Sequence, residues 1–144
     1  MNKKARVGVV AVATTGLMAL APLAFANWTA YNWDNKGVNA ESQRWSDGDY
    51  TQVQFTGCHN GYTSYIADSV DVQVWRVINN WPDDSYDKKT FTACYGAGTS
   101  NGEWSEIPTG TAQYYFQIMA IGGKTVGGPT VDVEKVYVDT TKAD

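Results

Sequence analysis

Alternating hydrophobic and polar positions recur along the chain from residue 50 onward. In residues 50–56, Val53 and Phe55 alternate with two glutamines. A period of two residues is typical of a strand with one face in the core. Residues 112–121 are apolar on one face and half polar on the other, which predicts a strand in the interior of a sheet.

Shorter runs of the same kind predict six further strands, at 28–33, 62–67, 70–78, 88–95, 103–107 and 131–138. The alternation changes phase near Trp75 and again between Val133 and Val136. We expect a β-bulge or a change of sheet at the first of these positions. Asn60 followed by Gly61 predicts a tight hairpin into 62–67. Turn-forming residues predict loops at 79–87, 96–102 and 122–129.

No stretch after residue 26 has the period of an amphipathic helix. Seven or eight short strands, with turn signals about every 8–14 residues, predict an all-β fold. The expected architecture is a small antiparallel β-sandwich. Its patterning fits an immunoglobulin-like topology and a jelly roll equally well.

Residues 1–26 have the pattern of a secretory signal peptide. Lys3, Lys4 and Arg6 precede an apolar, alanine-rich segment, and residues 24–26 read Ala-Phe-Ala, which suits signal peptidase. Cleavage there would leave residues 27–144 as a single secreted domain. The basic start and the alanine-rich segment favour a bacterial host, and a Gram-positive one. We expect no membrane insertion after cleavage.

The charge of the chain excludes some partners. The whole sequence has 11 basic and 15 acidic residues, and removal of the leader leaves 8 basic ones, a net charge of −7. Nucleic acids and anionic membranes attract clusters of lysine and arginine. The sequence therefore predicts no nucleic-acid partner and no binding to an anionic membrane surface.

Two cysteines, Cys58 and Cys94, are the only ones in the chain. In an oxidising compartment a single pair most often forms one disulfide. Free thiols and metal ligands are the alternatives, but two thiols without Cys-x-x-Cys spacing make a poor metal site. We therefore predict one disulfide between these residues.

Catalytic residues are scarce. The one histidine, His59, lies in a predicted turn and in no nucleophile motif, so the pattern does not predict a Ser/His/Asp triad. Glycosidases need two carboxyl groups close together. The carboxylates considered for this role are Asp71, Glu103, Glu106, Asp132 and Glu134. Glu103 and Glu106 flank Trp104 and are the most suggestive pair, but carboxylates on strands are usually the solvent-facing half of the alternation. We expect no enzymatic activity.

Asp83, Asp84 and Asp87 form an acidic stretch that is a weak candidate for calcium. The spacing matches no EF-hand or calcium-binding repeat, and a solvated acidic loop is the simpler interpretation. We expect no metal and no cofactor.

Aromatic residues carry the main functional signal. Five of them lie in polar, turn-rich surroundings: Trp28, Tyr31, Trp33, Trp45 and Trp81. Exposed rings can stack on the C–H faces of sugars, while neighbouring amides bind hydroxyl groups. Such rings also form hot spots between proteins, or close the ends of a small sandwich.

We therefore expect a secreted, monomeric, non-enzymatic protein that binds an extracellular glycan or cell-wall polymer through these five residues. The alternative is a secreted inhibitor or antimicrobial factor that acts on a protein target. That alternative requires one rigid protruding loop, at 96–102 or 79–87. A small hydrolase would instead require a facing pair of acids in a cleft.

Overall fold

The structure is a computed structural model that describes residues 27–61 and 64–141. The predicted leader, residues 1–26, lies outside the described residues. The elements are β1 (Trp28–Gly37), β2 (Trp45–Asp47), β3 (Thr51–Asn60), β4 (Val70–Arg76), β5 (Asp84–Phe91), the 3-10 helix η1 (Ala93–Tyr95), β6 (Thr99–Trp104), β7 (Ala112–Ile121) and β8 (Thr130–Asp139). All strand pairs are antiparallel, which confirms the predicted all-β fold.

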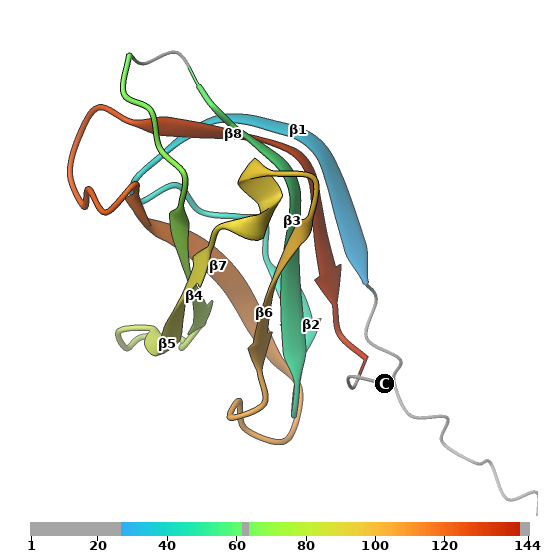
Figure 1. The fold of residues 1–144 in the computed structure, drawn as a ribbon. Coiled ribbons are helices and arrows are strands. Elements are labelled where there is room, and N and C mark those ends of the chain that lie inside the picture. Colours follow the sequence, from blue (N-terminus) through green and yellow to red (C-terminus); the bar gives the residue numbers. More distant parts are fainter. Residues whose placement is uncertain (1–26, 62–63, 142–144) are drawn as a thin grey trace, which may run out of the picture.

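The strands form two four-stranded sheets packed as a sandwich (Figure 1). The first sheet has the order β1-β8-β3-β6, and the second has the order β2-β7-β4-β5. Strand β4 pairs with β5, β3 with β6, β2 with β7 and β1 with β8. The chain is therefore one long nested hairpin rolled into two sheets, which is the topology of a jelly roll.

The core lies between the two sheets. Phe55 from the first sheet meets Phe116 from the second at a ring-centroid distance of 5.4 Å, and Phe91 at 5.1 Å, both edge to face. Trp104 is fully buried beside them. Strand β7, which was predicted to be interior, pairs with β2 on one side and β4 on the other.

Both predicted phase changes are present. The β4–β5 register shifts between Gln73 and Trp75, which confirms the expected bulge. In β8, Val133 and Val136 are both buried although they are three residues apart. Strand β3, which pairs with β8, changes phase at the same level. Gly57 lies beside Glu134 and has a φ of +67°, which breaks the alternation of β3 there.

The predicted strand at 62–67 is wrong for residues 64–67, which are irregular; residues 62 and 63 lie outside the described part of the chain. The turn residues have another role. The Asn60 side chain accepts a hydrogen bond from the amide of Ala67 at 2.7 Å. The Gly61 amide donates to the carbonyl of Thr130 at 3.0 Å, which continues the pairing with β8. Strand β3 therefore pairs with β6 and β8, and forms no hairpin at Asn60.

Three predicted boundaries near the disulfide were also wrong. Strand β5 begins at Asp84, inside the predicted loop 79–87, and the predicted strand 88–95 ends in η1. Strand β6 occupies part of the predicted loop 96–102. Its glycine has a packing role: a Cβ on Gly102 would lie 2.9 Å from the ring of Phe91 and 2.6 Å from that of Trp104. Gly102 is therefore needed because two buried rings pack against it, and it does not mark a turn.

Candidate functional site

Three of the five candidate aromatic residues belong to the core. Trp45 is only 4% exposed, so its proposed role in binding is corrected: the ring is not accessible. Trp28 is half-buried and stacks on Phe116 at 6.4 Å. Trp33 is half-buried and meets the same ring edge to face at 5.2 Å. These tryptophans lie on the inner side of the first strands and help to fill the space between the sheets.

The other two candidates are exposed. Trp81 is 76% exposed and Tyr31 is 69% exposed. Trp81 lies in the loop between β4 and β5, at the tip of the nested hairpin, whereas Tyr31 lies on the edge strand β1 (Figure 1). The two exposed candidates, Trp81 and Tyr31, therefore lie on different surfaces of the molecule.

The segment 77–83, which we name the Trp81 loop, is held by hydrogen bonds at its base. The Val77 amide donates to the carbonyl of Gln113 on β7 at 2.8 Å. The Ile78 amide donates to Asp83 Oδ1 at 3.0 Å, which joins the two ends of the loop. Trp81 itself donates from its amide to the carbonyl of Ile78 at 3.4 Å. These hydrogen bonds hold the backbone of the loop at its base.

The second oxygen of Asp83 is also engaged. The Tyr115 hydroxyl donates a hydrogen bond to Asp83 Oδ2 at 3.0 Å. Burial, the hydrogen bond to Asp83 and the charge of that carboxylate together raise the pKa of Tyr115 to about 12, so the hydroxyl keeps its proton. Trp75 stacks on Tyr115 at 6.4 Å, and the Arg44 guanidinium lies 5.9 Å from the tyrosine ring. Sequence analysis did not identify Tyr115, which occupies an ordinary strand position.

Amide groups flank the exposed indole. Asn79 and Asn80 are both exposed and directly precede Trp81. Asn80 has a φ of +64°, a left-handed conformation that asparagine tolerates better than most residues. Pro82 follows the tryptophan and restricts its backbone to extended conformations. The loop therefore combines an open aromatic ring with two exposed amide side chains.

The candidate calcium residues do not form a cluster that could hold an ion. Both oxygens of Asp83 accept the hydrogen bonds described above. Asp84 and Asp87 are exposed positions on β5. Residues 27–61 and 64–141 contain no group of three or more histidine, cysteine or acidic side chains placed to bind a metal.

The other carboxylates considered for catalysis are exposed or already paired. Glu103 lies on the outer side of β6 and accepts a hydrogen bond from Gln52 at 3.0 Å, and Glu106 is exposed in the segment after β6. Asp71 pairs with Lys88 at 3.0 Å. None of these side chains combines burial with a free carboxyl group, which is the setting of a catalytic acid.

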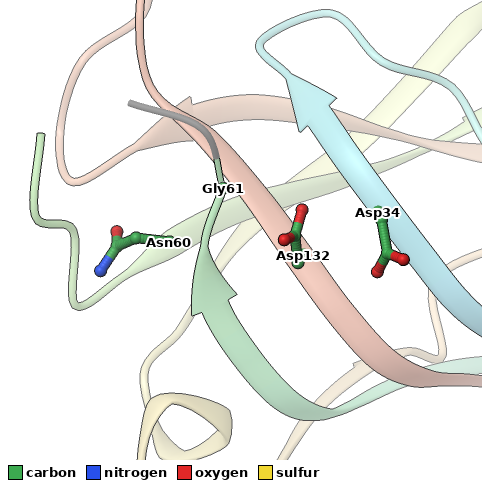
Figure 2. A pocket seen from close by; sticks show the side chains of 4 residues that line it. All are labelled: Asp34, Asn60, Gly61 and Asp132. Carbon is green, nitrogen blue, oxygen red and sulfur yellow. The ribbon is translucent and has the colours of Figure 1, made fainter. Parts of the chain in front are cut away.

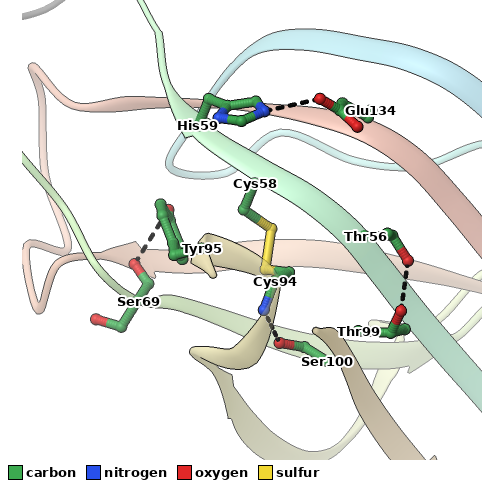
Figure 3. Close-up of a disulfide and its surroundings, with 9 residues drawn as sticks. All are labelled: Thr56, Cys58, His59, Ser69, Cys94, Tyr95, Thr99, Ser100 and Glu134. Atoms are coloured by element: carbon green, nitrogen blue, oxygen red, sulfur yellow. Dashed lines mark hydrogen bonds and ion pairs between the residues drawn. A yellow bond between two sulfur atoms is a disulfide. The ribbon is translucent and has the colours of Figure 1, made fainter. Parts of the chain in front are cut away.

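His59 pairs with Glu134, as Figure 3 shows, with 2.9 Å between Nε2 and Oε1. Both side chains are more than half exposed. The pair crosses from β3 to β8 over Gly57, whose missing side chain leaves room for Glu134. No serine or cysteine thiol is hydrogen-bonded to the imidazole among the described residues. The contact has the geometry of a surface ion pair.

A shallow pocket lies on the same outer side of the first sheet (Figure 2). It is lined by Asp34, Asn60, Gly61 and Asp132. Asp34 lies where the β1–β8 register shifts, and Asp132 Oδ1 accepts a hydrogen bond from the Asn35 amide at 2.6 Å. The pocket is lined by two acids, an amide and a glycine, and by no aromatic ring.

The predicted disulfide between Cys58 and Cys94 is confirmed, with an S–S distance of 2.01 Å (Figure 3). It joins β3 to η1, and both cysteines are buried. The Cys94 amide donates to Ser100 Oγ at 2.9 Å, which ties the helix to β6. The cross-link therefore stabilises the corner of the sandwich next to the first sheet.

No helix in the described part of the chain is long and apolar enough to cross a membrane. Comparison with models of known protein families found no match. A search of curated proteins also found none. The candidate site therefore has to be interpreted from its own geometry.

Proposed function

We propose that this protein is an exported, non-enzymatic protein that binds an uncharged polysaccharide through the Trp81 loop. The observation that carries the proposal is the open indole of Trp81, held on a fixed loop between two exposed asparagines and Pro82. An indole ring offers a flat apolar face to the C–H groups of a sugar. The neighbouring amides can donate to and accept from its hydroxyl groups.

The fixed base of the loop favours binding because less ordering is needed when a ligand arrives. Asp83 contributes both its oxygens to this base, through the amide of Ile78 and the hydroxyl of Tyr115. Export is supported by the signal-peptide pattern of residues 1–26 and by the disulfide. By analogy at the level of fold alone, jelly-roll sandwiches include lectin domains.

Inhibition of a protein target is the second candidate function. A tryptophan on a rigid, convex loop is also typical of a hot spot between proteins. Asp84 and Asp87 directly follow the loop and are exposed, so such a target would have basic groups around an apolar pocket. We place this candidate second because two exposed amide side chains, Asn79 and Asn80, directly precede the tryptophan and suit hydroxyl groups.

Retention on insoluble cellulose, chitin and xylan tests the proposal. We expect the oxidised protein to be retained on one of these polymers, and the Trp81→Ala variant to lose at least about tenfold in apparent affinity. Ile66→Ala is the matched control, because Ile66 is also an apolar side chain on an irregular segment and is 85% exposed. Retention on none of the polymers, or equal retention of both variants, would overturn the proposal. Assays against secreted proteases would then test the second candidate.

A further inference from the structure

We infer that the part of the outer side of the first sheet around Tyr31 is a second polysaccharide site, so that one molecule bridges two polymer chains. This inference rests on the proposed function, because it assumes the same class of ligand at both sites. We name the second surface the Tyr31 face. Its residues are Thr29, Tyr31, Gln52, Gln54, Thr56, Thr99, Asn101, Glu103, Lys135, Tyr137 and Asp139.

Strand register places these side chains in rows across the sheet. Tyr31 of β1 lies opposite Lys135 of β8, which lies opposite Thr56 of β3. In the next row, Tyr137 of β8 lies opposite Gln54 of β3. The inward neighbours on the same strands are buried in the core, so these side chains face outward.

Hydrogen bonds between neighbouring side chains fix the amides of this face. Gln54 Nε2 donates to Gln52 Oε1 at 2.8 Å, and Gln52 Nε2 donates to Glu103 Oε1 at 3.0 Å. The hydroxyl groups of Thr56 and Thr99 are also hydrogen-bonded, at 2.8 Å (Figure 3). This relay leaves Gln54 Oε1 and Glu103 Oε2 without partners within the face. They are acceptors suited to sugar hydroxyl groups.

The composition of the face favours a carbohydrate over a protein partner. None of its residues is aliphatic, whereas the centres of protein interfaces are depleted of charged residues and rich in apolar contacts. Its apolar surface comes from tyrosine rings, of which Tyr31 is 69% exposed. Within the Tyr31 face, Lys135 offsets one of the two carboxylates, Glu103 and Asp139, so this face is less acidic than the neighbouring part of the outer side, which carries Asp34, Asp132 and Glu134. An uncharged polyhydroxy polymer matches this chemistry.

The two sites lie diagonally across the sandwich. Strand β1, which carries Tyr31, is at one edge of the first sheet. The Trp81 loop precedes β5, which is at the far edge of the second sheet, next to β6. Figure 1 shows β1 and the β4–β5 loop on opposite sides of the molecule. One short oligosaccharide cannot span both surfaces, but two polymer chains can occupy them together.

Two independent sites on one molecule raise its apparent affinity for a polymer. The second contact is intramolecular once the first has formed, and such linkage typically strengthens binding by about 10²–10⁴-fold. A bivalent protein also cross-links dissolved polymer, which a protein with one site cannot do. Cross-linking therefore separates the inference from the proposed function.

The test uses soluble counterparts of the polymers named above: hydroxyethyl cellulose, glycol chitin and soluble xylan. We expect the full oxidised protein to precipitate one of these polymers. Titration calorimetry with a hexasaccharide of the same polymer should give two sites per molecule. Trp81→Ala and the double variant Tyr31→Ala, Gln54→Ala should each bind one hexasaccharide and precipitate nothing. Ile66→Ala should behave as the unchanged protein.

If calorimetry gives one site per molecule, and Trp81→Ala abolishes binding to it, the second site is overturned and the proposed function stands. Binding to none of the polymers would overturn both. Precipitation that persists in the Tyr31→Ala, Gln54→Ala variant would also overturn the inference. Thermal unfolding checks that each variant is folded. If the double variant does not fold, Asn101→Ala replaces it as the substitution on the Tyr31 face.

Discussion

The hydroxyl of Tyr115 donates a hydrogen bond to Asp83 Oδ2 at 3.0 Å and so joins the Trp81 loop to the second sheet. Tyr115 is 7% exposed and its neighbour Trp75 packs against it. The base of the loop that carries the exposed Trp81 is thus held by a buried residue of the second sheet.

Tyr115→Phe should loosen the loop without disturbing its residues directly. Removal of the hydroxyl leaves one oxygen of Asp83 without its donor, so we expect a loss of about 1 kcal/mol in unfolding free energy. Apparent affinity for the retained polymer should fall about threefold to tenfold. Denaturant unfolding and polymer retention measure the two effects. Tyr95→Phe is the control, because its hydroxyl bonds weakly to the Ser69 carbonyl, at 3.5 Å, outside the loop. Equal loss of affinity in both variants would contradict the role of Tyr115.

The disulfide should supply a large part of the stability. Cys58 and Cys94 are 36 residues apart in sequence. Closure of a loop of that length stabilises a folded protein by roughly 4 kcal/mol in the chain-entropy model. We expect the Cys58→Ala, Cys94→Ala variant to unfold at a lower guanidinium concentration by a corresponding amount. A difference below about 1 kcal/mol would show that the corner of the sandwich is held by packing alone.

Asp47 should make stability decrease as pH rises. Its side chain is fully buried, Oδ2 has no hydrogen-bond partner, and burial raises its pKa from 3.8 to about 6. Between these values the folded state keeps a proton that the unfolded state releases. The stabilisation is therefore complete below pH 4 and lost as pH rises through 6, by up to about 3 kcal/mol.

Asp47→Asn isolates this effect, because the amide oxygen can still accept from Gly48, which lies 2.7 Å from Oδ1. From pH 4 to pH 7 the unfolding free energy of the unchanged protein should fall relative to that of Asp47→Asn. Parallel pH profiles for the two proteins would show that folding does not raise the pKa of Asp47.

Gly102→Ala should destabilise the core by overpacking. The new methyl group would lie within 3 Å of the rings of Trp104 and Phe91, and such crowding costs about 1–3 kcal/mol. Gly96→Ala is a matched control, since its Cβ would come no closer than 3.6 Å to the Ala93 carbonyl. Thermal unfolding compares the two, and similar midpoints would contradict the packing role.

Sequence patterning predicted the strands that have one buried and one solvated face. Strand β7 was predicted at its observed bounds, and the phase changes at Trp75 and in β8 were visible in the alternation alone. Prediction was wrong where a residue type has two physical roles. Asn60 and Gly61 were interpreted as a hairpin, but they end β3 by bonding to Ala67 and Thr130. No local pattern distinguishes these uses.

The sequence also did not distinguish the buried aromatic candidates from the exposed ones. Trp28, Trp33 and Trp45 lie in polar sequence, yet their rings point into the sandwich. Trp28 and Trp33 both face the core although they are five residues apart, because the alternation of β1 is interrupted at Asn32, which has a φ of +54°. Burial of Trp45 depends on contacts with residues far away in sequence, such as Phe116. Exposure of Trp81 could be predicted from its turn-rich surroundings, but the hydrogen bond between Asp83 and Tyr115 could not.

Nested pairing has a consequence for the order of assembly. Strand β1 is hydrogen-bonded to β8 alone, so the first strand has no partner until the last one is available. The β4–β5 hairpin has the shortest connection, and each outer pair closes a longer one. Because loop-closure entropy grows with loop length, we expect strand pairing to begin at the centre and proceed outward. Oxidation of Cys58 and Cys94 can fix β3 beside η1 before β1 and β8 meet. Strands β1 and β8 can therefore pair only when all of residues 28–139 are available for folding.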